Sequence, residues 1–110
     1  MRQQQIEVRN WVQSIGKRYF DPLTNLGQLT EEVGELARIL IREYGQQSWK
    51  KGSAPENVRQ AIADELADIA FVVFCLSDQL DIDLEDAFKE KLRLKTDRDR
   101  ERHMSNKKLD

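Results

Sequence analysis

The sequence predicts an all-α domain built from four helices. Apolar residues recur at intervals of three and four through most of the chain, which is the period of an amphipathic helix. Turn-forming residues interrupt this pattern at 21–22, 45–55 and 81–83, so three connections separate four segments. Hydrophobic residues make up 39% of the 110 residues and charged residues 35%. A domain of this size therefore has a thin core, and we expect it to gain burial by forming oligomers.

The first two helices are expected over residues 2–19 and 23–44. Asp21 is placed to cap the second helix, and Pro22 suits a first helical position because its missing N–H is not needed there. Gly45 follows the last apolar position and is predicted to end this helix.

The third and fourth helices are expected over residues 55–80 and 84–102. Residues 71–76 are apolar all round, which predicts that the third helix is central in the fold. Asp83 is predicted to cap the fourth helix. The whole chain is expected to form one domain over residues 1–103, followed by a disordered tail over 104–110.

Composition excludes several classes of protein. A net charge of −2 excludes a broad basic surface for nucleic acid and a polybasic membrane patch. No apolar run approaches the roughly 20 residues of a membrane span, and the first residues lack the apolar segment of a secretory signal. The lone cysteine, Cys75, lies in an apolar run and is expected in the core. We therefore expect a soluble cytoplasmic protein without nucleic-acid or membrane partners.

Two stretches, 29–36 and 62–69, repeat one pattern of acids and apolar residues thirty-three positions apart. On a helix, each copy places two acids three residues apart at the margin of an apolar stripe. These inner acids are Glu32, Glu35, Glu65 and Asp68.

Nothing within helical reach compensates these charges, because no lysine or arginine lies three or four residues from Glu32 or Glu65. If the two stripes pack together, the carboxylates meet in a partly dry cleft, where such groups take up a proton or bind a cation. Oxygen ligands without histidine or cysteine suit Mg²⁺, with Mn²⁺ as a substitute. Two amphipathic helices with ordinary acidic flanks are the alternative, and the matching phase of the two copies favours the metal site.

Two further features bear on phosphate or nucleotide binding. Lys91, Lys95 and Arg98 fall on one helical face, although interleaved acids also fit a simple solvated face. Trp49 precedes two lysines in the longest loop, where it either covers a nucleotide or packs beneath the loop.

The paired acid motifs resemble the E-E-x-x-E and E-x-x-D signature of the MazG-like nucleotide pyrophosphohydrolases, in the all-α NTP pyrophosphatase superfamily. The resemblance extends from about residue 19 to residue 99 and includes a Tyr-Phe-x-Pro-Leu lead-in shared with the small, single-domain YpjD-like group. It implies a bundle-like protomer that assembles as a dimer or a dimer of dimers. It also implies Mg²⁺-dependent cleavage of a nucleoside triphosphate, ribo or deoxy, between the α and β phosphates, which yields the monophosphate and pyrophosphate.

The same resemblance assigns roles by position. Glu32, Glu35, Glu65 and Asp68 match the family's metal ligands, and Glu31 matches its outer acid. Glu35 or Glu31 would orient or deprotonate the attacking water.

Substrate contacts follow less directly. Arg98 matches a phosphate-binding arginine, with Lys91 or Lys95 as the accompanying lysine, whereas Thr96 stands where the family commonly has asparagine. Aromatic residues would stack on the base, and the candidates are Trp11, Phe20 and Trp49.

Two other functions remain open from the sequence. A non-enzymatic helical oligomer could use the acids to bind a regulatory cation or a basic partner. A related hydrolase could act on dUTP or on phosphoribosyl-ATP. The preferred base and sugar, the number of metal ions and the size of the oligomer do not follow from the sequence.

Overall fold

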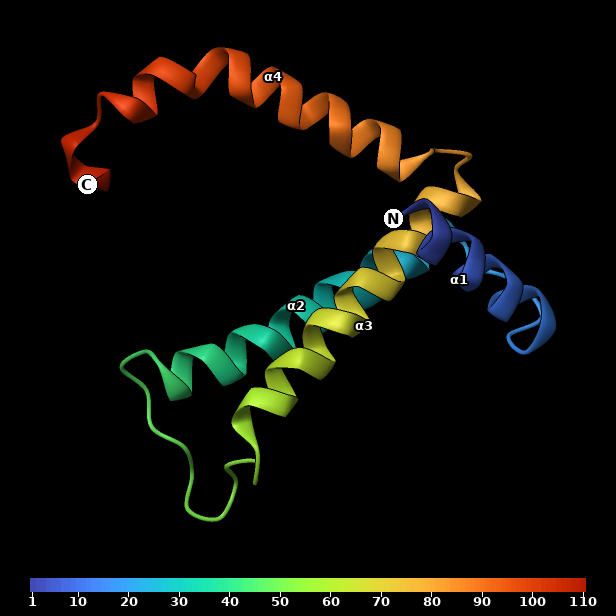
Figure 1. The fold of residues 1–110 in the computed structure, drawn as a ribbon. Coiled ribbons are helices and arrows are strands. Elements are labelled where there is room, and N and C mark those ends of the chain that lie inside the picture. The colour runs from blue at the N-terminus through green and yellow to red at the C-terminus, as the bar shows by residue number, and fades with distance from the viewer.

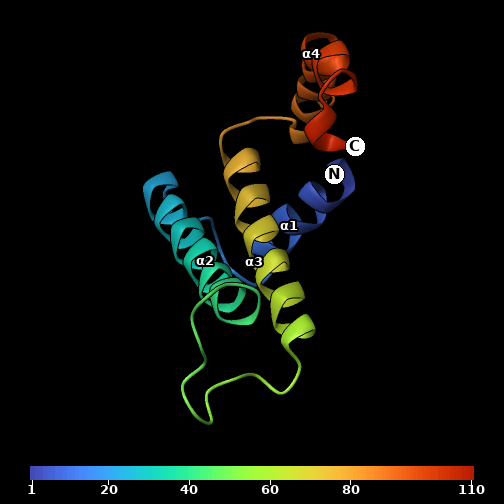
Figure 2. The same cartoon turned by 90° about the vertical axis from the view of Figure 1, so that its left-hand side faces the viewer.

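The computed structural model describes residues 1–110 and contains four α-helices and no strand, which confirms the all-α prediction (Figure 1). The helices are α1 (Arg2–Ser14), α2 (Pro22–Glu43), α3 (Val58–Gln79) and α4 (Leu84–Met104). Helices α2 and α3 pack against each other as an antiparallel pair, and α1 packs on α3. Helix α4 contacts α1 and then extends away from the other three (Figures 1 and 2). No helix is both long enough and apolar enough to span a membrane.

Side-chain caps fix where three of the helices begin. Asp21 accepts a hydrogen bond from the backbone N–H of Thr24 at 2.9 Å, and Asp83 caps α4 in the same way, as the sequence predicted. Helix α3 begins at Val58 rather than near residue 55, because Asn57 supplies its cap.

Helix α1 ends at Ser14, five residues before the predicted end at Tyr19. Lys17 has a φ of 71°, in the left-handed region, and the chain turns there. The Tyr19 hydroxyl then donates a 2.6 Å hydrogen bond to Asp78 near the end of α3. This contact across the fold replaces the last turn that local spacing predicted.

Asp78 joins α3 to α1 as well as to the α1–α2 loop. Its side chain is only 7% exposed, and Arg9 Nε donates to its Oδ1 at 2.8 Å. The hydrogen bond from Arg9 holds the pKa of Asp78 below its usual range. A buried carboxylate satisfied on both oxygens fixes the angle between the two helices.

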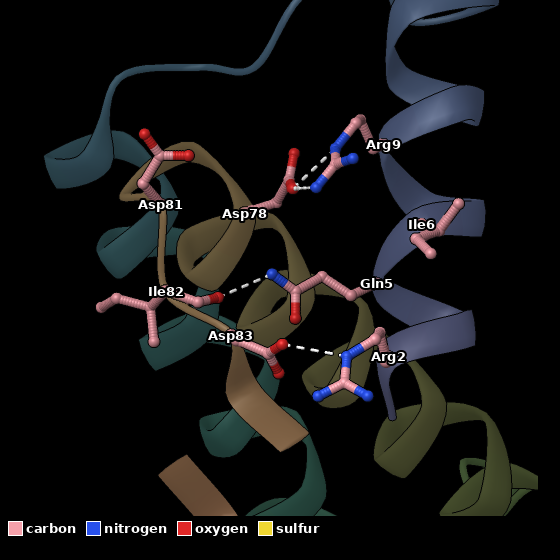
Figure 3. Close-up of a pocket in the computed structure, with 8 residues that line it drawn as sticks. All are labelled: Arg2, Gln5, Ile6, Arg9, Asp78, Asp81, Ile82 and Asp83. Atoms are coloured by element: carbon pink, nitrogen blue, oxygen red, sulfur yellow. Dashed lines mark hydrogen bonds and ion pairs between the residues drawn. The ribbon is translucent and has the colours of Figure 1, made fainter. Parts of the chain in front are cut away.

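Figure 3 shows the hollow beside this joint, about 310 Å³ in volume, between α1 and the turn that leads into α4. Gln5 bridges the two sides: its Nε2 donates to Ile82 O at 2.7 Å, and its Oε1 accepts from Leu84 N at 3.2 Å. Arg2 Nε donates to Asp83 at 2.9 Å. Because Arg2 is paired with Asp83 and Arg9 with Asp78, which leaves Asp81 as the one charged lining residue without an ion pair, we interpret this hollow as a structural joint.

The protomer buries little of its apolar surface. Seven of 110 residues are buried, and they include Val12, Ile39, Val72 and Cys75, so Cys75 lies in the core as predicted. The radius of gyration is 17.9 Å, whereas a compact chain of this length has about 13 Å. Helix α4 contributes no buried residue. The predicted thin core is therefore present, and much apolar surface is left without a partner within the chain.

The last residues form a short 3-10 helix at Lys107–Leu109, capped by Asn106, in the segment for which the sequence predicts a disordered tail. Disorder of this segment in solution stays a prediction.

Candidate metal and nucleotide site

Three of the predicted metal ligands meet between α2 and α3. One carboxylate oxygen from each of Glu32, Glu65 and Asp68 lies within 4.8 Å of the others. Glu32 and Glu65 are half-buried, and Asp68 is exposed. The antiparallel packing of the two helices creates the group, because each helix presents the margin of its apolar stripe to the other.

Glu65 holds the most constrained oxygen of this group. Its Oε2 is sealed from solvent and has no hydrogen-bond partner. The neighbouring Glu32 carboxylate, which would accept a hydrogen bond from a protonated Glu65, together with burial and the charges of Glu32, Asp68 and Glu35, raises the pKa of Glu65 to about 7. Every ion pair in the structure lies elsewhere. An orphaned carboxylate oxygen among like charges, without a cationic side chain, fits a hard divalent cation such as Mg²⁺ or Mn²⁺.

The remaining acids of the motifs lie outside this group. Glu35 is exposed, one turn from Glu32, and its charge still contributes to the raised pKa of Glu65. Glu31 is exposed as well. Beside them, a Cβ added at Gly34 would meet no atom within 4 Å, so no other part of the chain contacts α2 at this position.

Two of the predicted aromatic residues line one cavity. Trp11 from α1 and Phe20 from the α1–α2 loop border a space of about 240 Å³ beside the α2–α3 pair. Trp11 packs edge-on against Phe71 of α3, with ring centroids 5.6 Å apart and an interplanar angle of 85°. Val72 and Cys75 add apolar surface from α3. The cavity is mainly apolar, with aromatic rings available for stacking.

Trp49 is not part of this cavity. In the α2–α3 loop it lies under Arg38, whose guanidinium carbon is 5.5 Å from the ring centroid. Its Nε1 donates to Glu43 at 3.3 Å. The structure thus places Trp49 on the end of α2, apart from Trp11 and Phe20.

The predicted phosphate-binding cations are all on α4. Lys91 and Lys95 are exposed, and Arg98 pairs with Asp99 at 2.9 Å. Because α4 extends away from the α2–α3 pair, one chain does not bring these side chains to the acids (Figures 1 and 2). Their role at phosphate stays a prediction that requires α4 of a second chain or a movement of this helix.

Asn25 and Gln28 also line the cavity, although neither belongs to a sequence motif that predicts a binding site. Asn25 is only 4% exposed. Both residues precede Glu32 at helical spacings of seven and four, so they share its face of α2. A search for polar residues in register with the acids would have found them.

Comparison with known proteins gives consistent matches over most of the chain. The family model for the MazG nucleotide pyrophosphohydrolase domain matches residues 20–103. The protein YpjD of Bacillus subtilis (strain 168) is 35% identical over 102 residues, which cover 93% of this chain and 88% of YpjD.

Two solved structures also resemble this fold. The crystal structure of YpjD from Bacillus subtilis matches with a TM-score of 0.69 at 35% identity, over 81% of this chain and 87% of that one. A Bacillus-conserved MazG protein, a nucleotide pyrophosphohydrolase, matches with a TM-score of 0.67 at 34% identity, over 83% of each chain.

Proposed function

The chain belongs to the MazG nucleotide pyrophosphohydrolase family, and we propose that it cleaves nucleoside triphosphates, ribo or deoxy, between the α and β phosphates. It is thus a hydrolase, and the products of the proposed reaction are the monophosphate and pyrophosphate. The observation that carries the proposal is the orphaned Oε2 of Glu65 at the meeting point of three carboxylates.

The donor set fits Mg²⁺, with Mn²⁺ as a substitute. Glu32, Glu65 and Asp68 would hold the ion, and Glu35 would join them by a change of side-chain rotamer from the adjacent turn. When bound, the metal neutralises phosphate charge and lowers the pKa of a coordinated water.

Water activation falls to an acid outside the group of three. Glu35 is exposed, adjacent to the cluster and free of ion pairs, so its carboxylate is available to accept a proton from water or to orient it. Glu31, on the neighbouring position of α2, is the alternative for this role.

We further propose that the protein acts as a homodimer or homotetramer. Phe88, Leu92 and Leu94 on α4 are each about half exposed, and this helix has no buried residue. An extended protomer with this much apolar surface is stabilised by packing on a second copy. The same packing would allow Lys95 and Arg98 of one chain to approach the acids of another.

Glu32→Gln and Asp68→Asn test the proposed reaction. Each substitution removes one carboxylate of the group, so we expect each to abolish Mg²⁺-dependent turnover while circular dichroism shows an intact helical fold. Asp64→Asn is the matched control, because Asp64 is exposed and its carboxylate accepts from Gln60 instead. Full activity in either site variant, measured as pyrophosphate release, would contradict the assignment.

Thermal melting separates the enzyme from a non-enzymatic docking protein. An enzyme of this kind melts at a higher temperature with Mg²⁺ and nucleotide together than with Mg²⁺ alone or with EDTA. A protein that uses the acids only to dock a basic partner would show no effect of nucleotide.

A further inference from the structure

The aromatic cavity lies in line with the acids along the same pair of helices. On α2, Gln28 precedes Glu32 by one turn, and on α3, Phe71 follows Asp68 by three residues. At a rise of about 1.5 Å per residue, the cavity begins roughly 4.5–6 Å from the acid group along the helix axes. A nucleotide with phosphates at the acids would therefore bring its base to this cavity.

The size of the cavity limits what it can hold. Its volume of about 240 Å³ is below the roughly 300–1,000 Å³ of pockets that enclose a whole drug-sized ligand. It has room for a base beside Trp11, Phe20 and Asn25, and the sugar and phosphates would lie outside.

A chain of amide hydrogen bonds fixes the orientation of Asn25 at the edge of this cavity. Gln79 Nε2 donates to Phe20 O at 2.8 Å, so Gln79 Oε1 points toward Asn25. Asn25 Nδ2 donates to that oxygen at 2.7 Å and also approaches Phe20 O at 3.4 Å. The donor side of the Asn25 amide is thus engaged by the protein.

The acceptor side of Asn25 is free. No group in the chain donates to its Oδ1. This oxygen is nevertheless not sealed from solvent, because Glu65 Oε2 is the only unpartnered side-chain atom that is sealed. Asn25 lines the cavity, so a ligand in the cavity has access to Oδ1. A nearly buried acceptor with a fixed orientation and no partner is a site for a ligand N–H.

We propose that the cavity binds the nucleobase and that Asn25 Oδ1 selects bases with an exocyclic amine. This inference rests on the proposed function and deepens it. The amine of a cytosine-type or adenine-type base donates to Oδ1, whereas the corresponding uracil or hypoxanthine presents a carbonyl oxygen to the same atom. Two acceptors that face each other both stay without a hydrogen bond. This distinguishes an amino base from a carbonyl base more strongly than shape alone.

Fluorescence of Trp11 measures base binding without metal or turnover. The chain has two tryptophans, so Trp49→Phe leaves Trp11 as the sole reporter, and Trp49 is outside the cavity. Quenching by CMP is compared with quenching by UMP, and AMP with IMP, because each pair differs by an amine against a carbonyl. We expect the amino nucleotide of at least one pair to bind about tenfold more tightly or better.

Asn25→Leu, combined with Trp49→Phe, removes the acceptor and keeps a side chain of similar size. The amino and carbonyl nucleotides of each pair should then bind with about equal affinity. Gln28→Leu is the matched control: it removes another amide that lines the cavity and leaves Asn25 and its partners Gln79 and Phe20 unchanged, so the preference should persist.

Equal affinities within both pairs, or no quenching by any of the four nucleotides, would overturn the proposal, even if Asn25→Leu failed to fold. Hydrolysis of CTP, UTP, ATP and ITP is measured in parallel. Hydrolysis without base preference would refute only the role of Asn25, whereas amine-selective binding without any hydrolysis would refute only the proposed reaction.

Discussion

Without metal, the Glu65→Gln variant should be more stable than the wild type. With metal bound to the wild type, the variant should be the less stable of the two. The Oε2 atom of Glu65 is sealed from solvent and unpaired, and Glu32 and Asp68 lie beside it. A glutamine amide donates to these carboxylates and removes one negative charge from the group.

The magnitude follows from the single orphaned oxygen. A buried polar atom without a partner costs about 1–3 kcal/mol, and the partly open setting of this group favours the lower end. A gain of about 1 kcal/mol raises the Tm of a domain of this length by about 4–6 °C. Metal at 100 times its Kd stabilises the wild type by about 2.7 kcal/mol. This exceeds the stability gained by Glu65→Gln, so with metal the wild type should be the more stable of the two proteins.

The assay is thermal unfolding followed by circular dichroism, at one protein concentration because an oligomer's Tm depends on it. Wild type and Glu65→Gln are melted in EDTA and in excess Mg²⁺. Asp64→Asn makes the same charge change on an exposed position of the same helix and should respond to Mg²⁺ as the wild type does. Two results would refute this prediction: a Tm of Glu65→Gln below that of the wild type in EDTA, or a rise in Tm with Mg²⁺ as large as that of the wild type.

Three other substitutions test separate features. Asp78→Asn should lower stability at pH 7 by about 2–3 kcal/mol in urea unfolding, because it removes the charge paired with Arg9. Because the pKa of Asp78 is lowered in the folded state, its contribution to stability is present above about pH 4 and is lost as the pH falls through the folded-state pKa. The stability of the variant should therefore fall less steeply with acid than that of the wild type. Parallel plots of stability against pH would contradict this. Leu92→Glu, on the exposed face of α4, should reduce the mass measured by light scattering while helicity persists, and an unchanged mass would exclude α4 from the interface. Glu35→Gln should lower kcat by about 10²–10⁴-fold, and a near-normal kcat would remove Glu35 as the base.

Local spacing was sufficient to predict the four helices, apart from the end of α1 and the start of α3, and the meeting of three of the four inner acids between α2 and α3. Glu32 and Glu65 fall on the margins of apolar stripes, and helix geometry alone brings such margins together once the stripes pack. Glu35 lies three residues from Glu32, about 60° around the helix, and Asp68 has the same offset from Glu65, yet of these two exposed acids only Asp68 joins the group. The distance of Glu35 from the other acids depends on how closely α3 approaches, and sequence spacing does not contain that distance.

Contacts between distant residues were not predictable in the same way. The buried Asn25 donates its amide hydrogen bond to Gln79, 54 positions away, and the Tyr19 hydroxyl, beyond the end of α1, donates to Asp78, 59 positions away. Neither partnership has a local signature. The direction of α4 was equally inaccessible, because the helix has no buried residue and is held at its start by ion pairs from Arg2, more than 80 positions away, to Asp83, Glu85 and Asp86.

The most direct test of the central claim is ³¹P NMR of a nucleoside triphosphate incubated with the protein and Mg²⁺. The proposed site predicts that the α, β and γ resonances are replaced by those of the monophosphate and pyrophosphate, and that Glu65→Gln prevents this change. Formation of the diphosphate and orthophosphate instead, or equal turnover by Glu65→Gln, would contradict it.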